Sequence, residues 1–188
     1  MIAMTFENIA ASELQYVQDR KKGSKWTGSK YESIKDASMT VKGDFGERVA
    51  QQCLQFLGID AEIINGGKGE FDILCESINT TFENKLATED TNYSFQFNGI
   101  KLDVNYDYVF CLGVTPDELL FEIVPKGDFK KFGSFVPMTK DGKDSWKMTV
   151  RKNRLQKYSE NNLRQRLLEL DIINNHLYSV PTNVPMAL

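Results

Sequence analysis

The chain has 188 residues, of which 41% are hydrophobic and 26% are charged, and its formal net charge is −3. This length and composition are typical of one soluble globular domain with a substantial core. No apolar run approaches the length of a bilayer-spanning helix, which excludes a helical membrane protein. Met1 to Thr5 lack the basic and apolar regions of a secretory signal, so we expect a cytoplasmic protein. Cys53, Cys75 and Cys111 lie singly in apolar runs, without zinc-site spacing, and are expected to be reduced.

Two helices are predicted first along the chain. Residues 6–21 have an amphipathic pattern, and a lysine- and glycine-rich loop follows them over residues 21–30. The second helix is expected to begin at Asp44, an N-cap residue type, and to end at Gly58. Its apolar stripe predicts one face packed against a core.

A run of strands with one interruption is predicted next. Strands are expected near residues 61–65, 71–76 and 80–86, and then a helix that includes Phe95, Gln96 and Phe97. Two more strands are expected at residues 106–114 and 118–124. The pattern predicts an α/β (α+β) fold with the core order helix-strand-strand-strand-helix-strand, in a single domain.

The most informative residues are two acids and a lysine on neighbouring predicted strands. Asp72 lies between the apolar residues of the 71–76 strand, and Glu83 and Lys85 share one face of the 80–86 strand. Side by side, these strands bring Asp72 and Glu83 to one point, with the Lys85 ammonium beside them. Paired carboxylates suit a hard divalent cation such as Mg²⁺, and the lysine adds positive charge near a bound phosphate. The alternative is a solvated hairpin with a surface salt bridge worth about 0–1 kcal/mol.

Two further side chains are candidates for the same site. Glu47 is predicted in the first helical turn, from which it could reach the carboxylate pair. Its alternative role is a favourable charge at the helix N-terminus, worth about 0.3–1 kcal/mol. Gln96 could steady Lys85 or a water molecule, or it could pack beside Phe95 and Phe97.

These motifs resemble the PD-(D/E)xK nuclease superfamily, particularly the small type II restriction endonucleases. The resemblance rests on Gly46-Glu47, on Asp72, on the Glu83-Asn84-Lys85 triplet and on the strand at residues 106–114, and it covers about residues 42–125. It implies a restriction-endonuclease-like core, in which a central mixed β-sheet is flanked by helices in the order αβββαβ.

The resemblance also implies roles for individual residues. Asp72 and Glu83 would hold Mg²⁺, and Lys85 would serve the attacking water. The sequence departs from the family pattern at Phe71, where proline is frequent, and at Asn84, where an apolar residue is usual. The backbone carbonyl of Asn84 could be a further metal ligand, whereas an inward-facing side chain would need a hydrogen-bond partner.

Positive charge is concentrated in the C-terminal third of the chain. Residues 1–125 hold 11 basic and 20 acidic side chains, whereas residues 126–166 hold 12 basic and 4 acidic ones. A basic loop with interleaved aromatic residues precedes a predicted helix at residues 154–170. One face of that helix carries side-chain types that bind phosphates and base edges, namely Arg154, Lys157, Asn161, Arg164 and Gln165. The alternative is an ordinary amphipathic surface helix.

The combined features predict a Mg²⁺-dependent endonuclease that hydrolyses double-stranded DNA, most simply a type II restriction endonuclease. A homodimer is expected, because two-fold symmetry suits the cutting of two antiparallel strands. A Holliday-junction resolvase or repair nuclease on the same core is an alternative enzyme. A non-catalytic DNA-binding protein is the alternative outside the enzymes.

Overall fold

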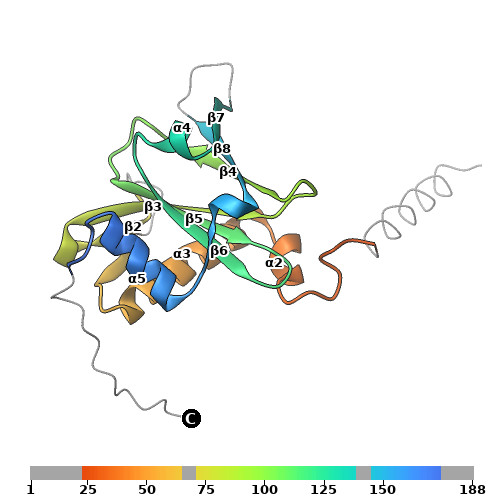
Figure 1. Cartoon of the computed structure of the whole chain (residues 1–188), viewed down its shortest axis with the longest axis horizontal. Helices are drawn as coiled ribbons and strands as arrows, with labels where there is room; N and C mark the ends of the chain where they lie inside the picture. The colour runs from red at the N-terminus through yellow and green to blue at the C-terminus, as the bar shows by residue number, and fades with distance from the viewer. Residues whose placement is uncertain (1–22, 65–70, 139–144, 175–188) are drawn as a thin grey trace, which may run out of the picture.

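The computed structural model describes residues 23–64, 71–138 and 145–174. The fold is mixed α+β, with a six-stranded mixed sheet, a second sheet of three strands and a few helices (Figure 1). The helix predicted at residues 6–21 lies outside the described residues. Within the described part of the chain, no helix combines the length and apolarity that crossing a membrane requires.

The long helix α3 (Met39–Phe56) follows the short α2 (Glu32–Asp36) and begins earlier than predicted. Ser38 is its N-cap, and the Ser38 side chain accepts a hydrogen bond from the Val41 N–H. The prediction of Asp44 as N-cap is therefore wrong, and Glu47 lies in the helix interior rather than in the first turn. The helix buries Gly46, Ala50 and Leu54, which recur every four residues and therefore share one face.

The six-stranded sheet has the order β1-β2-β3-β5-β6-β9. Only the β3–β5 pair is parallel, and the other neighbours are antiparallel. A single turn of 3₁₀ helix, η1 (Glu76–Ile78), joins β2 to β3. The strands are β1 (Ala61–Ile63), β2 (Ile73–Cys75), β3 (Thr80–Thr88), β5 (Tyr108–Val114), β6 (Leu119–Pro125) and β9 (Gln156–Lys157).

The second sheet corrects a prediction. It has the order β4-β8-β7 and contains β4 (Ser94–Ile100), β7 (Ser134–Pro137) and β8 (Trp146–Arg151). The segment predicted as a helix at Phe95 to Phe97 is therefore part of a strand. Phe95 and Phe97 are fully buried and Gln96 between them is exposed, which is the two-residue period of a strand with one covered face. The predicted αβββαβ order consequently has a strand in place of its second helix.

The sheets and helices form three layers. On one face of the six-stranded sheet, α3 and the C-terminal helix α5 (Glu160–Glu169) cover a core that includes Phe82, Phe110 and Phe121. On its other face, the three-stranded sheet covers Val109 and Cys111. The short helix α4 (Phe129–Phe132) belongs to this second side, and Figure 1 draws it beside β7 and β8. β3 therefore lies between a helical layer and a second sheet.

The predicted helix at residues 154–170 is also corrected. Arg154 ends a 3₁₀ turn, η2 (Lys152–Arg154), and Lys157 lies in the edge strand β9. The α-helix begins only after Ser159, whose side chain accepts a hydrogen bond from the Asn162 N–H. The five residues predicted to share one helical face therefore belong to three different elements.

Candidate active site

The candidate site is built where β2 and β3 lie side by side. Asp72 directly precedes β2, whose first residue Ile73 lies opposite Phe82 in this antiparallel pair, so Asp72 lies at the segment of β3 that carries Glu83 and Asn84. The Asp72 N–H donates to the Phe82 carbonyl oxygen at 3.0 Å. The Asn84 N–H in turn donates to Asp72 Oδ2 at 2.7 Å, so the Asp72 carboxylate is fixed by the backbone of β3. The structure thus brings Asp72 and the Glu83-Asn84-Lys85 triplet together.

Glu83 and Lys85 form an ion pair on the same face of β3. Lys85 Nζ lies 2.5 Å from Glu83 Oε1, and the two side chains are 19% and 9% exposed, respectively. This pair is more buried than a solvated hairpin salt bridge, which was the alternative reading of the motif. An ammonium group held against a buried carboxylate at the edge of a pocket is available to a ligand that enters the pocket.

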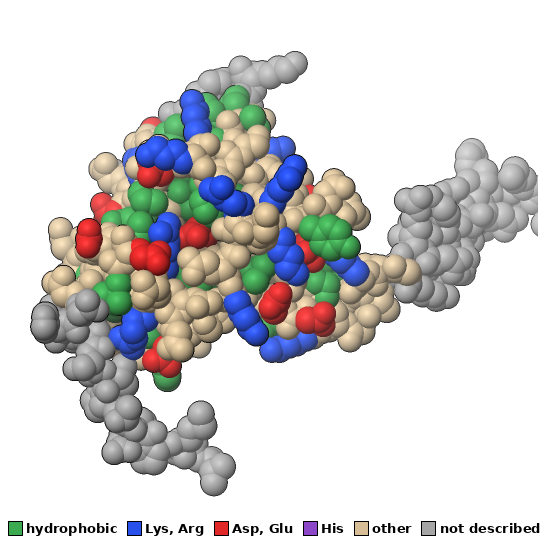
Figure 2. All heavy atoms as spheres, in the orientation of Figure 1, with side chains coloured by type: hydrophobic (Ala, Val, Ile, Leu, Met, Phe, Trp, Pro, Cys, Tyr) green, Lys and Arg blue, Asp and Glu red, His purple; other side chains and the backbone are tan. Residues whose placement is uncertain are grey.

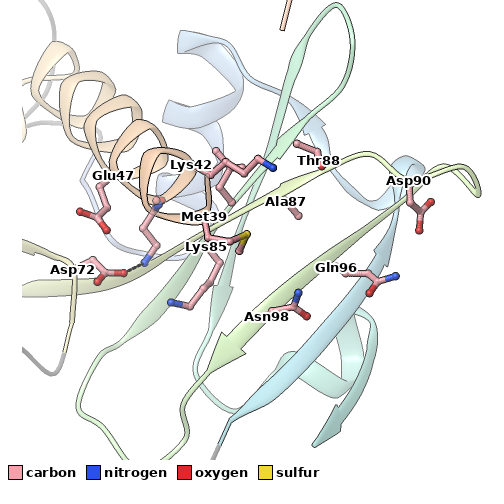
Figure 3. Close-up of a pocket in the computed structure, with 13 residues that line it drawn as sticks. Met39, Lys42, Glu47, Asp72, Lys85, Ala87, Thr88, Asp90, Gln96 and Asn98 are labelled. Carbon is pink, nitrogen blue, oxygen red and sulfur yellow. Dashed lines mark hydrogen bonds between the residues drawn. The ribbon is translucent and has the colours of Figure 1, made fainter. Parts of the chain in front are cut away.

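Glu47 reaches the same place from α3. Figure 3 shows its carboxylate next to that of Asp72, at one end of the pocket. The close approach of α3 to β3 requires Gly46, because a Cβ atom at that position would lie 2.7 Å from Asn84 Nδ2 and 3.3 Å from Leu86 Cβ. Glu47 therefore lies beside Asp72 because α3 approaches β3 closely at Gly46, and not because Glu47 occupies the first turn of the helix as predicted.

The residues surround a pocket of about 390 Å³ between α3, β3 and β4. Gln96 and Asn98 project into it from β4, opposite the α3 side, as Figure 3 shows. Gln96 lines the pocket, whereas Phe95 and Phe97 point into the core, and a role of Gln96 toward Lys85 or a water stays a prediction. Glu83 does not line the pocket, although its ion-pair partner Lys85 does. The main polar lining residues are Lys42, Glu47, Asp72, Asn84, Lys85, Thr88, Asp90, Gln96 and Asn98.

The acids influence one another's protonation. Burial raises the pKa of Glu83, with the Asp72 charge adding to this effect and the Lys85 ammonium opposing it. Burial also raises the pKa of Glu47, and the charges of Asp72 and Asp44 act in the same direction. The carboxylates of Glu47, Asp72, Glu83 and Asp90 outnumber the two lysines of the pocket, Lys42 and Lys85, and a cation near Asp72 would relieve the repulsion.

The donor chemistry fits a hard divalent cation, since the pocket end offers carboxylate and amide oxygens. Among the described residues, no group of three or more His, Cys, Asp or Glu side chains is arranged so that it could hold a metal ion. Both predicted ligands already accept a hydrogen bond, Asp72 from the Asn84 N–H and Glu83 from Lys85. Joint binding by Asp72 and Glu83 would use the other oxygens of these carboxylates, Oδ1 and Oε2, or would require the Lys85–Glu83 pair to open.

Asn84 was predicted to act through its backbone carbonyl. Its side chain points toward α3, on the face of β3 opposite to Glu83 and Lys85. The buried Asn84 Oδ1 accepts no hydrogen bond from a described residue, although an unsatisfied buried amide costs about 1–3 kcal/mol. This orphaned oxygen on a residue that lines the pocket is an acceptor available to a bound water or ligand.

The predicted DNA-binding residues do not share one helical face, because they lie on η2, β9 and α5. Arg154 donates to the Lys131 carbonyl oxygen at 3.2 Å, and Arg164 pairs with Glu160 at 3.5 Å on α5. Lys157 is exposed on the edge strand, while Asn161 and Gln165 lie on α5. Of the described residues that line the pocket, none comes from β9 or α5. The prediction of one helical recognition face is therefore wrong, and DNA binding by these residues stays a prediction.

The sequence analysis missed Asn98 and Lys42 as pocket residues. The signal for Asn98 was the alternation of Phe95, Gln96, Phe97 and Asn98, which has the period of a strand. Lys42 gave no such signal, because its place depends on where α3 begins. Comparison with known proteins does not identify a family for this chain, because no protein family model and no curated protein matches it.

Proposed function

We propose that the protein is a Mg²⁺-dependent endonuclease that hydrolyses phosphodiester bonds of double-stranded DNA, on a restriction-endonuclease-like core of the PD-(D/E)xK type. One observation carries the proposal. Asp72 and Lys85 line one pocket, and Glu83, the ion-pair partner of Lys85, is close enough to Asp72 for the Asp72 charge to raise the pKa of Glu83. The α3-β1-β2-β3 succession and the parallel β3–β5 pair support the proposed core.

The chain's own residues have distinct tasks in this proposal. Asp72 and Glu83 would hold the cation, and the Glu47 carboxylate adds negative charge close to Asp72. When bound, Mg²⁺ would supply a Lewis acid for the scissile phosphate and would activate a water molecule. The Lys85 ammonium, released from Glu83, orients that water and offsets the negative charge that develops on the phosphate.

Gln96 and Asn98 complete the pocket on the β4 side. Their amides can donate hydrogen bonds to phosphate oxygens and accept them from a water molecule. Neither amide carries charge, so both can position a strand without adding to the excess of acids. We place the enzyme with the type II restriction endonucleases, acting as a homodimer at symmetric sites.

A cleavage assay tests the proposal. Purified protein is incubated with supercoiled plasmid in Mg²⁺ or in EDTA, with Asp72→Asn as the test variant and Asp117→Asn as the control, since Asp117 is exposed and does not line the pocket. We expect the wild type and the control to produce discrete linear fragments in Mg²⁺ only, and Asp72→Asn to produce none.

The products also separate the competing functions. Cleavage confined to four-way junctions would favour a Holliday-junction resolvase, and cleavage confined to damaged duplexes would favour a repair nuclease. DNA binding without cleavage of any substrate would contradict the catalytic proposal and favour the non-catalytic DNA-binding protein.

A further inference from the structure

We propose that the outer face of the three-stranded sheet β4-β8-β7 is the surface that binds duplex DNA and holds it against the catalytic pocket. The inference deepens the proposed function and rests on it for the position of the cut strand. It replaces the helical recognition face that the sequence predicted.

Strand register defines this outer face. Gln96 of β4 lies opposite Thr149 of β8, and Thr149 lies opposite Ser134 of β7, so these three side chains form a row on one side of the sheet. Lys147 lies opposite Val136 on the same side. The alternate residues of the strands, among them Phe95, Phe97 and Met148, are buried against the six-stranded sheet. Apart from the exposed Val136, the outer face is therefore polar, and the side chains of the row and of Lys147 are exposed or half-buried.

The face is basic as well as polar. The three strands contain no Asp or Glu, and they contribute Lys147 and Arg151 to this side. Neither side chain forms an ion pair with another described residue. In Figure 2, several Lys and Arg side chains gather at the end of the molecule where Figure 1 places α4, β7 and β8. Unpaired cations on a polar surface are what phosphate backbones require.

The outer face connects two concave regions. Gln96 and Asn98 line the catalytic pocket, and Thr149, which lies opposite Gln96, lines a groove of about 850 Å³ together with Arg151 and Arg154. The neighbouring residues Gln96 and Thr149 therefore connect the pocket that contains Asp72 and Glu47 to the groove that contains Arg151 and Arg154.

The dimensions suit a duplex. Neighbouring strands are about 4.8 Å apart, so the three strands span about 10 Å. A major groove about 12 Å wide admits a two-stranded β-ribbon such as the β4-β8 pair, and glutamine and asparagine amides pair with adenine there. Lys147 and Arg151 would contact phosphates while Gln96 and Asn98 face the strand nearest Asp72.

The α5 surface is less suited to the same task. Its arginines are engaged by acids of the protein, Arg164 by Glu160 and Arg166 by the buried Glu122. Phosphates would have to displace these partners. Substituting cations on the outer face of the β4-β8-β7 sheet is therefore expected to change the DNA affinity more than substituting cations on the α5 surface.

The test measures binding without cleavage. In an Asp72→Asn background and in EDTA, fluorescence anisotropy of a labelled 20-base-pair duplex is followed over a range of salt concentrations. Lys147→Gln with Arg151→Gln is expected to weaken binding about tenfold or more and to reduce the salt slope by about 0.9 for each charge removed. The matched control, Lys157→Gln with Arg164→Gln, removes the same charge and is expected to change the affinity less than twofold.

A second measurement needs no change at the proposed surface. Lysine acetylation of the Asp72→Asn protein, with and without duplex, should show that DNA protects Lys147 and leaves Lys157 reactive. Equal losses of affinity in the two double variants, or protection of Lys157 rather than Lys147, would overturn the sheet-face proposal. Because neither readout depends on cleavage, a failure of the nuclease proposal would appear separately, as an inactive wild type.

Discussion

The packing of α3 against β3 should show up as opposite effects of two glycine substitutions on the same helix. Gly43 and Gly46 both lie in the interior of α3, but a Cβ atom at position 43 meets nothing within 4 Å. At position 46 it would lie 2.7 Å from Asn84 Nδ2 and 3.3 Å from Leu86 Cβ. Asn84 and Gly46 are both buried, so the methyl group has no free space to enter.

The magnitudes follow from two opposing effects. Replacing glycine by alanine in a helix interior gains about 0.8–1.0 kcal/mol, and this gain is common to both variants. Overpacking at a buried contact costs about 1–3 kcal/mol and applies only to Gly46→Ala. Gly43→Ala should therefore raise the free energy of unfolding by about 1 kcal/mol. The free energy of unfolding of Gly46→Ala should be about 1–3 kcal/mol lower than that of Gly43→Ala. For a chain of this size that difference is about 2–12 °C in Tm.

Urea denaturation and thermal melting of both variants measure the difference. Gly46→Ala should also displace Glu47 and Asn84 from the pocket, and so weaken Mn²⁺ binding more than Gly43→Ala does. If the two variants are equally stabilised, α3 does not pack against Asn84, and the explanation for Glu47 lying beside Asp72 is wrong.

Three further predictions concern charge and burial. Burial raises the pKa of Glu47 in the folded protein. The contribution of Glu47 to the free energy of unfolding is therefore complete below about pH 4.5, and it is lost as the pH rises through the pKa of Glu47 in the folded state. Glu47→Gln should therefore raise the urea midpoint at pH 7 and leave it unchanged at pH 4; an equal rise at both would contradict this. Arg166→Met leaves the buried Glu122 carboxylate without its cationic partner and should lower the free energy of unfolding, measured by urea denaturation, by about 3–5 kcal/mol. Adding Glu122→Gln to this variant should recover much of that loss. Burial raises the pKa of Cys75 to about 12, so iodoacetamide at pH 8 should modify it only after unfolding, as mass spectrometry of the peptide would show.

The parts of the fold that the sequence predicted well are those set by local pattern. β2 and β5 lie within the predicted ranges, and β3 and β6 overlap theirs but end two residues and one residue later, because long apolar or alternating runs bounded by turns specify strands directly. The meeting of Asp72 and Glu83 followed from one short connection, η1, between two strands.

The errors have physical causes that local pattern does not contain. Phe95-Gln96-Phe97 alternates with a strand period, but β4 exists only because β8, distant in sequence, pairs with it. The basic face was assigned to one helix because leucines recur through residues 155–170, yet Leu155 packs under the second sheet while Leu163 and Leu167 pack under the first. Ser38 was overlooked as an N-cap, which shifted α3 by six residues.

The central claim is that Asp72 and Glu83 together bind a divalent cation, and the most direct measurement is Mn²⁺ binding followed by electron paramagnetic resonance. Wild-type protein, Asp72→Asn, Glu83→Gln and the control Asp117→Asn are titrated with Mn²⁺ as a spectroscopic substitute for Mg²⁺, with and without duplex DNA. We expect the wild type and the control to bind Mn²⁺, more tightly with DNA present, and both site variants to lose that binding. Binding by Asp72→Asn or Glu83→Gln that equals the wild type would contradict the claim.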